Sequence, residues 1–262
     1  MQSSIYLSTG LLESARWSRD KHPRLKLSQW IPAIRAAGFD GLELWENHIL
    51  KATEDEVAAV YDSGFPIAVW NSYAGFDDGE AASREATLKA ASESGAGAIK
   101  FNLGNDLDRL PVCLINLIDF ARKLPRNVAL FCECHANTVL EHVEDAAPIL
   151  LEINERIPVK VIVHPFNDEF PPVDGWFDAL GPLIVHAHVQ TRHPVDLARI
   201  LSIRSKKKLV REVLERMRDR GYDGTFSLEF TEGIRTAADE PETLMKVAAE
   251  DLLFLREEIA RL

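Results

Sequence analysis

The sequence predicts an α/β fold, a single (β/α)8 TIM barrel that takes up residues 1–262 as one domain. Eight short apolar, β-branched or aromatic runs recur along the chain, and amphipathic stretches follow them. Several runs are continuously apolar, which is typical of strands buried on both faces of a parallel sheet. No linker rich in Pro, Gly or Ser divides the chain. Eight strand–helix units in 262 residues form a closed barrel most economically, with an open doubly wound sheet as the alternative.

The strands are recognised by apolar runs that begin after a turn signal. The stretches AAGFDGLEL (36–44) and DRGYDGTFSLEF (219–230) echo one another, since both read helix end, glycine turn, strand and glutamate. This echo supports repetition of one structural unit. The eight expected strands cover residues 4–9, 41–45, 66–71, 97–102, 128–133, 159–164, 183–189 and 225–230.

The helices are recognised by apolar residues at helical spacing. In the first of them Leu27, Trp30, Ile31 and Ile34 share one face, and Gly38 ends the pattern. The second begins at a capping box formed by residues 53 and 56. The expected helices cover residues 27–38, 53–64, 80–95, 111–124, 138–154, 174–180 and 206–221, and a long one closes the chain over 242–262.

Composition narrows the function classes. The formal net charge is −11, which disfavours a nucleic-acid partner, and the basic run at 204–213 is interpreted as a solvated helix face. No apolar run approaches the roughly 18 residues that span a membrane, and no secretory signal is visible at the N-terminus. The three cysteines indicate a reducing compartment. We therefore expect a cytoplasmic protein with no membrane partner, and the sequence leaves a homo-oligomer open.

Polar residues close seven of the eight expected strands. In TIM barrels the chemistry lies at the C-terminal ends of the strands. Because burial of so many polar groups without partners is unfavourable, we expect them to converge as ligands or substrate contacts. The closing residues are Glu43, Asn71, Asn102, Glu133, His164, His186 or His188, and Glu229.

The stretch Cys132-Glu133-Cys134-His135 contains two candidate metal thiolates beside a glutamate and a histidine. Alternate residues of a strand face opposite sides, so Glu133 and His135 share one side and the two cysteines share the other. If Glu133 points into the barrel mouth, both thiols point towards the helices. We therefore interpret Cys132 and Cys134 as small buried hydrophobic residues rather than metal ligands.

Four residues at the ends of strands five to eight form the expected metal site, and they are Glu133, His164, His188 and Glu229. Two imidazoles and two carboxylates make a mixed nitrogen and oxygen ligand set. Such a set suits a divalent ion such as Mn, Co, Zn or Mg. On the seventh strand we favour His188 over His186 because it lies one step nearer the barrel mouth.

Five segments in order resemble the xylose isomerase-like TIM barrel superfamily of sugar isomerases and epimerases, which includes the AP endonuclease family 2 type. They are GFDGLELW, LFCECHANT, VIVHPFND, HAHVQTR and GTFSLEF. The resemblance implies that the four residues above hold the metal and that Glu43 contacts substrate or supports the site. There are departures: many relatives have Asp in place of His164. Ketose 3-epimerases carry His where this chain has Asn167, and isomerase-like members read His-Leu-Lys-Asp from His188 onward.

The expected function is metal-dependent isomerisation or epimerisation of a sugar or polyol through an enediolate. Glu133 and Glu229 are the expected catalytic acid and base. Two competent carboxylates would give epimerisation, and a single one would give aldose–ketose isomerisation. The alternatives are a dehydratase of a keto-polyol such as an inosose, a DNA-repair endonuclease, which the acidic charge disfavours, and a non-catalytic binding barrel. Expected substrate-binding residues are Glu43, Trp45, Asn71, Asn102, His135, Asn167 and Arg192.

Overall fold

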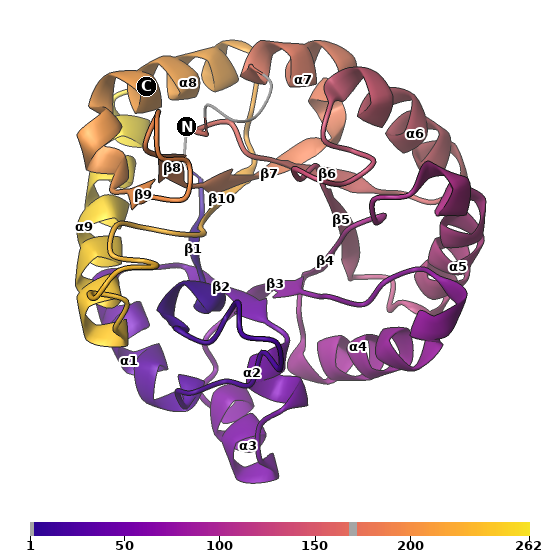
Figure 1. The fold of residues 1–262 in the computed structure, drawn as a ribbon, viewed down its shortest axis with the longest axis horizontal. Coiled ribbons are helices and arrows are strands. Elements are labelled where there is room, and N and C mark those ends of the chain that lie inside the picture. Colours follow the sequence, from indigo (N-terminus) through magenta and orange to yellow (C-terminus); the bar gives the residue numbers. More distant parts are fainter. Residues whose placement is uncertain (1–2, 168–171) are drawn as a thin grey trace.

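A computed structural model of the chain describes residues 3–167 and 172–262. Eight parallel strands close into a barrel in the order β1-β2-β3-β4-β5-β6-β7-β10 (Figure 1), which confirms the predicted (β/α)8 fold. Every expected strand is present within two residues of its predicted ends. They are β1 (Ile5–Ser8), β2 (Gly41–Trp45), β3 (Ile67–Asn71), β4 (Ala98–Phe101), β5 (Ala129–Glu133), β6 (Lys160–Val163), β7 (Ile184–Val189) and β10 (Thr225–Leu228).

Helices surround the barrel as an outer ring (Figure 1). Local signals set their ends: the Thr53 side chain accepts a hydrogen bond from the backbone N–H of Glu56, and Gly38 ends the first helix in the left-handed conformation with φ of 95°. The expected helices are α1 (Leu27–Ala37), α3 (Glu54–Asp62), α4 (Ala81–Ser94), α5 (Leu110–Lys123), α6 (Val143–Arg156), α7 (Val173–Leu180), α8 (Lys207–Asp219) and α9 (Pro241–Ala260). None of the helices among the described residues is long and apolar enough to cross a bilayer.

One helix boundary was predicted wrongly, since α6 begins at Val143 rather than at residue 138. The Thr138 hydroxyl donates to the carbonyl of His135 at 2.7 Å and accepts from the N–H of Leu140. These local bonds stabilise a turn instead of a first helical turn. The segment after β5 therefore stays irregular at the barrel mouth.

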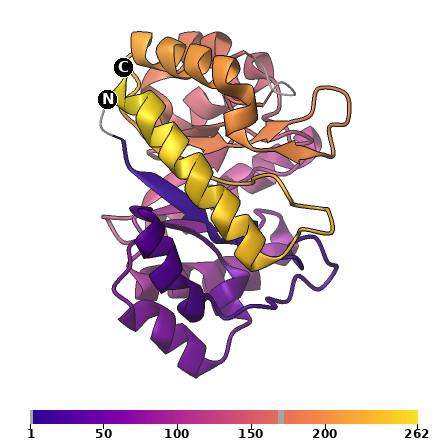
Figure 2. The ribbon, with the colours of Figure 1, turned by 90° about the vertical axis from the view of Figure 1, so that its left-hand side faces the viewer.

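Several short elements among the described residues were not predicted. A one-turn helix, α2 (Asn47–Leu50), follows β2 directly, and β8 (Thr191–Arg192) pairs antiparallel with β9 (Ile200–Leu201) after β7. Figure 2 shows the connection between β8 and β9 as an orange loop that extends beyond the barrel. It lies on the same side as the loop that precedes α9. Within residues 3–167 and 172–262, five short 3-10 helices lie at Thr9–Leu12, Asp78–Glu80, Leu107–Arg109, Gly181–Leu183 and Ile203–Lys206.

The apolar core lies between the sheet and the helices. Strand residues that face outward, such as Leu42 and Leu44, join helix residues such as Ile31 and Leu117 in one cluster. The inward-facing residues alternate with them. Several inward-facing residues near the C-terminal ends of the strands are polar and almost fully buried. The barrel thus carries its polar groups on its axis, at the end where the strands terminate.

Cys132 and Cys134 belong to the apolar layer between β5 and the helices. Both are free thiols with at most 1% exposed surface. Burial raises the pKa of each thiol above its ordinary value, so both are protonated at neutral pH. The interpretation of these cysteines as small buried hydrophobic residues is confirmed.

Candidate metal centre

Three of the four expected ligands meet at the ends of β5, β6 and β7. Glu133 Oε1 lies 3.2 Å from His164 Nε2 and 3.0 Å from His188 Nδ1. One ligand atom from each of these three residues falls within 4.8 Å of the others, and all three side chains are buried. The strand register explains the meeting, because each residue faces inward at the end of neighbouring strands.

Glu229, the fourth expected ligand, follows β10 and lies somewhat further away. Its Oε2 is 3.6 Å from the Nδ1 atoms of both His164 and His188. Gln190 donates to the same oxygen at 2.8 Å and also lies 3.3 Å from His164 Nδ1. The carboxylate is therefore adjacent to the three-residue cluster and held by an amide.

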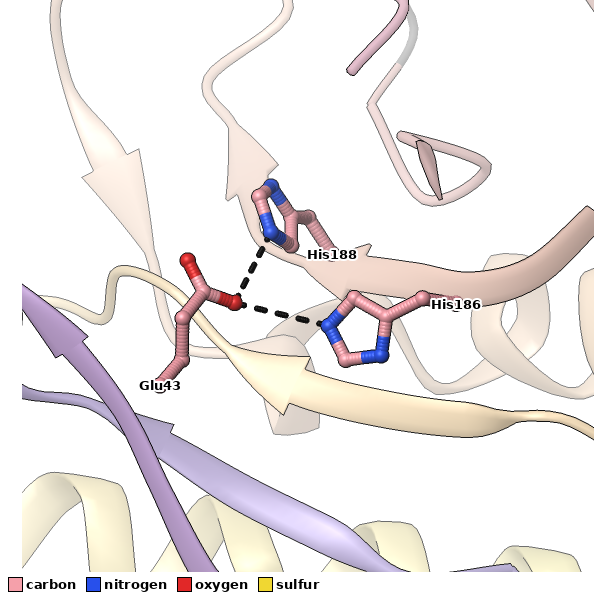
Figure 3. A group of neighbouring side chains, drawn as sticks. All are labelled: Glu43, His186 and His188. Carbon is pink, nitrogen blue, oxygen red and sulfur yellow. Dashed lines mark hydrogen bonds and ion pairs between the residues drawn. The ribbon is translucent and has the colours of Figure 1, made fainter. Parts of the chain in front are cut away.

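His188 is shared with a second cluster, which lies deeper in the barrel. Its Nε2 is 3.0 Å from Glu43 Oε2 (Figure 3). A carboxylate only accepts hydrogen bonds, so this nitrogen carries a hydrogen and donates it. The other nitrogen, Nδ1, is buried and makes no aligned hydrogen bond within the described residues, although Glu133 Oε1 is 3.0 Å away. A buried nitrogen oriented in this way is suited to bind a cation.

Charges from several sides act on His188. Burial lowers the pKa of its imidazole, but the nearby carboxylates of Glu43, Glu229 and Glu133 outweigh burial and raise the pKa well above its ordinary value. A cation bound at Nδ1 has to replace the proton there. The surrounding carboxylates therefore favour a positive charge at His188 Nδ1, carried either by a proton or by a metal ion.

His186 lies below His188 on β7 and forms the floor of the polar interior. Its Nε2 is 2.9 Å from Ser227 Oγ and 3.4 Å from Glu43 Oε2, and its Nδ1 is 2.7 Å from Thr225 Oγ1 (Figure 3 shows the contact with Glu43). Burial lowers the pKa of His186, which favours the neutral imidazole. Hydroxyl groups hold both nitrogens of His186 in place. The fixed imidazole then contacts Glu43 from the deeper side of the barrel.

Sequence reasoning missed Lys100, which lies on β4. Its Nζ is 2.6 Å from Glu133 Oε2, and the residue is 5% exposed. Burial lowers the pKa of this ammonium, but the charges of Glu133, Glu43 and Glu229 overcome burial and raise it. The same lysine holds the pKa of Glu133 well below its ordinary value. The signal was available, because a lysine inside an apolar strand run needs a buried partner.

The residues present fit a divalent cation. Distances of 3.0 and 3.2 Å between neighbouring ligand atoms match two atoms that each bind one ion at about 2.1 Å. Three buried carboxylates, those of Glu43, Glu133 and Glu229, act on the ammonium of Lys100. Once an ion replaces the proton on His188 Nδ1, the excess of two negative charges equals the charge of a divalent ion. The donor set of imidazole nitrogen and carboxylate oxygen suits Zn, Mn or Co.

A pocket of about 200 Å³ opens above this cluster at the C-terminal ends of the strands. Glu133, Glu229 and Lys100 reach its floor. Trp17 and Phe230 pack together on its wall with ring centroids 5.5 Å apart. The full lining consists of Ser8, Gly10, Arg16, Trp17, Trp45, Asn71, Tyr73, Lys100, Asn102, Glu133, His135, Glu229 and Phe230. Apolar rings over a charged floor can bind a small polar molecule with apolar faces.

The expected substrate-binding residues divide into two groups. Trp45, Asn71, Asn102 and His135 line the pocket. Asn102, in the amide orientation that satisfies its neighbours, donates to Glu133 Oε2 at 3.1 Å.

The second group lies away from the pocket lining. Glu43 is fully buried beneath the pocket and accepts from Asn71 Nδ2 at 3.0 Å. The backbone N–H of Asn167 donates to the carbonyl of His164 at 3.4 Å. Arg192 donates to the carbonyl of Leu197 within the β8–β9 hairpin. The geometry thus places Glu43 among the supports of the histidines.

The loop between β1 and α1 is anchored so that Trp17 forms part of the pocket wall. Glu13 is fully buried and accepts from His48 Nε2 at 3.0 Å and from two backbone N–H groups later in the loop. Arg16 donates to both carboxylate oxygens of Asp239, at 2.9 and 3.0 Å. Such charge-assisted bonds fix a loop more firmly than neutral ones. The pocket wall is therefore preformed.

Comparisons with known proteins show the same fold. The alignment with 3-keto-D-glucoside 4-epimerase YcjR from E. coli covers 98% of this chain and 100% of that chain, with 17% identity and a TM-score of 0.63. For D-allulose 3-epimerase from Methylomonas sp., solved with D-allulose, coverage is 98% of each chain, identity 12% and TM-score 0.65. Endonuclease IV from Thermus thermophilus matches over 90% of this chain and 95% of its own, with 16% identity and a TM-score of 0.62.

No protein-family model matches the sequence, and no curated protein matches it significantly. The expected resemblance to the xylose isomerase-like TIM barrels is confirmed at the level of the fold. Sugar epimerases and an endonuclease share this fold, so the function has to be argued from the site.

Proposed function

We propose that the protein is a cytoplasmic, single-domain enzyme that uses a divalent metal to isomerise or epimerise a small sugar or polyol. The observation that carries the proposal is the placement of Glu133 Oε1 3.0 and 3.2 Å from two buried imidazole nitrogens below a small pocket. Glu133, His164, His188 and Glu229 would hold the ion. When bound, it would supply Lewis acidity that acidifies the carbon-bound proton next to a carbonyl.

The chain's own residues would bind the substrate and move its proton. Glu229 lines the pocket beside His164 and His188 and keeps 7% of its surface exposed. It would accept a proton from the carbon next to a carbonyl. The ammonium of Lys100 would face the negative charge that develops on the enediolate oxygen. Trp17 and Phe230 would exclude water and pack against the apolar face of the sugar.

Pocket size supports a small substrate. The volume of about 200 Å³ is below the ~300–1,000 Å³ that is usual for drug-sized ligands. A polynucleotide would also need a basic surface, whereas the chain has a net charge of −11. These features favour a monosaccharide or cyclic polyol over a DNA substrate.

The test begins with metal content. Purified protein is freed of metal, and binding of Mn²⁺, Co²⁺, Zn²⁺ and Mg²⁺ is measured by calorimetry. We expect one tight site, weakened by about 100-fold or more in Glu133→Gln, since even loss of a supporting residue costs 10–100-fold. The matched control is Glu232→Gln, which alters a half-exposed glutamate in the loop after β10. Equal affinity in both variants would refute the metal centre.

The reaction is then assayed with D-fructose, D-allulose, D-tagatose and keto-inositols in D₂O by proton NMR. Deuterium uptake at carbon without loss of water supports isomerisation or epimerisation. Loss of water with appearance of an enone would instead support the alternative, a keto-polyol dehydratase that begins with the same proton abstraction. Metal binding without any turnover would leave a binding barrel.

A further inference from the structure

The two carboxylates expected to exchange protons have different surroundings. Both oxygens of Glu133 are engaged: Oε1 faces the two imidazoles, and Oε2 accepts from Lys100 at 2.6 Å. Asn102 donates to the same Oε2. The residue is 2% exposed. A proton taken from substrate would have to displace an ammonium or a ligand contact, so Glu133 is poorly placed to act as a base.

Glu229 differs in each respect. The hydrogen bonds that reach its carboxylate from the described residues end on Oε2, where Gln190 donates at 2.8 Å. Its side chain keeps 9% of its surface exposed, and the residue lines the pocket. One oxygen therefore remains available towards a bound molecule.

From this asymmetry we propose that Lys100 holds Glu133 as a dedicated metal ligand and that Glu229 alone transfers the proton, which makes the site an aldose–ketose isomerase centre. The inference rests on the proposed function and decides between its two forms. A two-sided epimerase needs a competent carboxylate on each face of the reacting carbon. Lys100 occupies the free oxygen on the Glu133 side.

The reaction balances without any co-reactant. Glu229 takes a proton from C1 of a ketose: the C–H bond breaks, an O–H bond forms, and the electron pair makes the double bond of an enediolate. The protonated Glu229 returns a proton to C2 on the same face. The hydroxyl proton of the C1 oxygen passes to the C2 oxygen. The product is an aldose, and the carboxylate is regenerated.

The first test uses the wild-type protein and examines its products. With Mn²⁺ in D₂O, the three ketoses should yield aldoses and no ketose epimerised at C3, with deuterium at C2 in the fraction of turnovers in which protonated Glu229 exchanges with solvent. A C3 epimer with solvent deuterium would overturn the inference while supporting the wider proposed function. If neither the ketoses nor the keto-inositols react, the proposed function fails, and the binding measurement below still tests the role of Lys100.

The second test measures Co²⁺ binding rather than turnover. Lys100→Met removes the ammonium with little change in shape and should weaken Co²⁺ binding by about 10–100-fold, because an oriented ligand loses its supporting donor. Lys123→Met is the matched control, since Lys123 pairs with Glu85 on the exposed surface. Binding by Lys100→Met within about threefold of wild type would refute the holding role. Circular dichroism checks folding, and if this variant does not fold the wild-type products decide.

Discussion

Glu43→Gln tests whether a carboxylate orients His188, the histidine that we propose to bind the metal. Glu43 Oε2 accepts from His188 at 3.0 Å and lies 3.4 Å from His186, and Oε1 accepts from Asn71 at 3.0 Å. The glutamine keeps the shape but offers one acceptor and one donor. If its oxygen faces His188, its amide nitrogen faces the amide nitrogen of Asn71, and two donors oppose each other. Either the histidine or the asparagine loses its partner.

The expected size of the effect follows from these contacts. Loss of a carboxylate that orients a metal-binding imidazole weakens metal binding by about 10–100-fold. That range corresponds to about 1.4–2.7 kcal/mol, since tenfold in affinity is about 1.4 kcal/mol. The free energy of unfolding should also fall by a similar amount, because a hydrogen bond to a charged group contributes about 1.5–3 kcal/mol.

Calorimetric titration with Mn²⁺ provides the measurement, and Glu46→Gln provides the matched control. Glu46 is also a buried carboxylate just after β2, but it accepts from the N–H of Tyr73 and from Thr87 and touches neither histidine. Both variants should lose stability, and only Glu43→Gln should lose metal affinity. Equal Mn²⁺ affinity in wild type and Glu43→Gln would show that His188 does not need this carboxylate, and the reasoning would be wrong.

Three further predictions concern stability. Burial raises the pKa of Glu13, but hydrogen bonds from His48 and two backbone N–H groups outweigh burial and lower it. The group thus stabilises the fold above its unfolded pKa, and this contribution disappears as pH falls through the folded pKa; Glu13→Gln should flatten this acid limb in denaturant titrations. Cys132 and Cys134, buried and protonated, should react with a thiol reagent only on unfolding, and fast native-state labelling would contradict this. Gly224→Ala should lower stability by about 1–3 kcal/mol, because its Cβ would lie 2.3 Å from a carbonyl oxygen of β7, and an unchanged melting temperature would contradict this.

Strand positions were predictable because strands buried on both faces leave continuous apolar runs between turn signals. The first residue of α6 was not predictable from helical spacing. Residues 138–142 have that spacing, but local hydrogen bonds of the Thr138 hydroxyl stabilise a turn there instead. The β8–β9 hairpin was missed because two-residue strands carry too little pattern to detect. Hydrophobic periodicity therefore predicts the strands and helices of the barrel. It does not predict the short polar segments, whose structure depends on local hydrogen bonds.

For the site, strand alternation predicted which side chains face the axis but not how far each one reaches. Glu133 is the last residue of β5, whereas Glu43 lies two residues before the end of β2, so Glu43 lies beneath His188 and Glu133 lies beside it. A sequence gives no depth along the barrel axis, so a supporting carboxylate and a candidate ligand look alike. Lys100 was overlooked for a related reason: it sits two residues before Asn102, the polar residue that closes its strand, and reaches Glu133 through its long side chain.

The buried polar groups on the barrel axis, from His186 up to Glu133, occupy positions that apolar residues could have filled, and their role is to orient one another. Replacing buried ion pairs with well-packed apolar residues is often neutral or stabilising, so stability alone does not account for Lys100 and Glu133. These polar groups instead fix the orientation of their neighbours' side chains. Hydroxyls fix His186, His186 and Asn71 fix Glu43, and Glu43 fixes the hydrogen on His188 Nε2. The consequence is that His188 Nδ1 faces Glu133 beside His164, which is the arrangement that one shared ion requires.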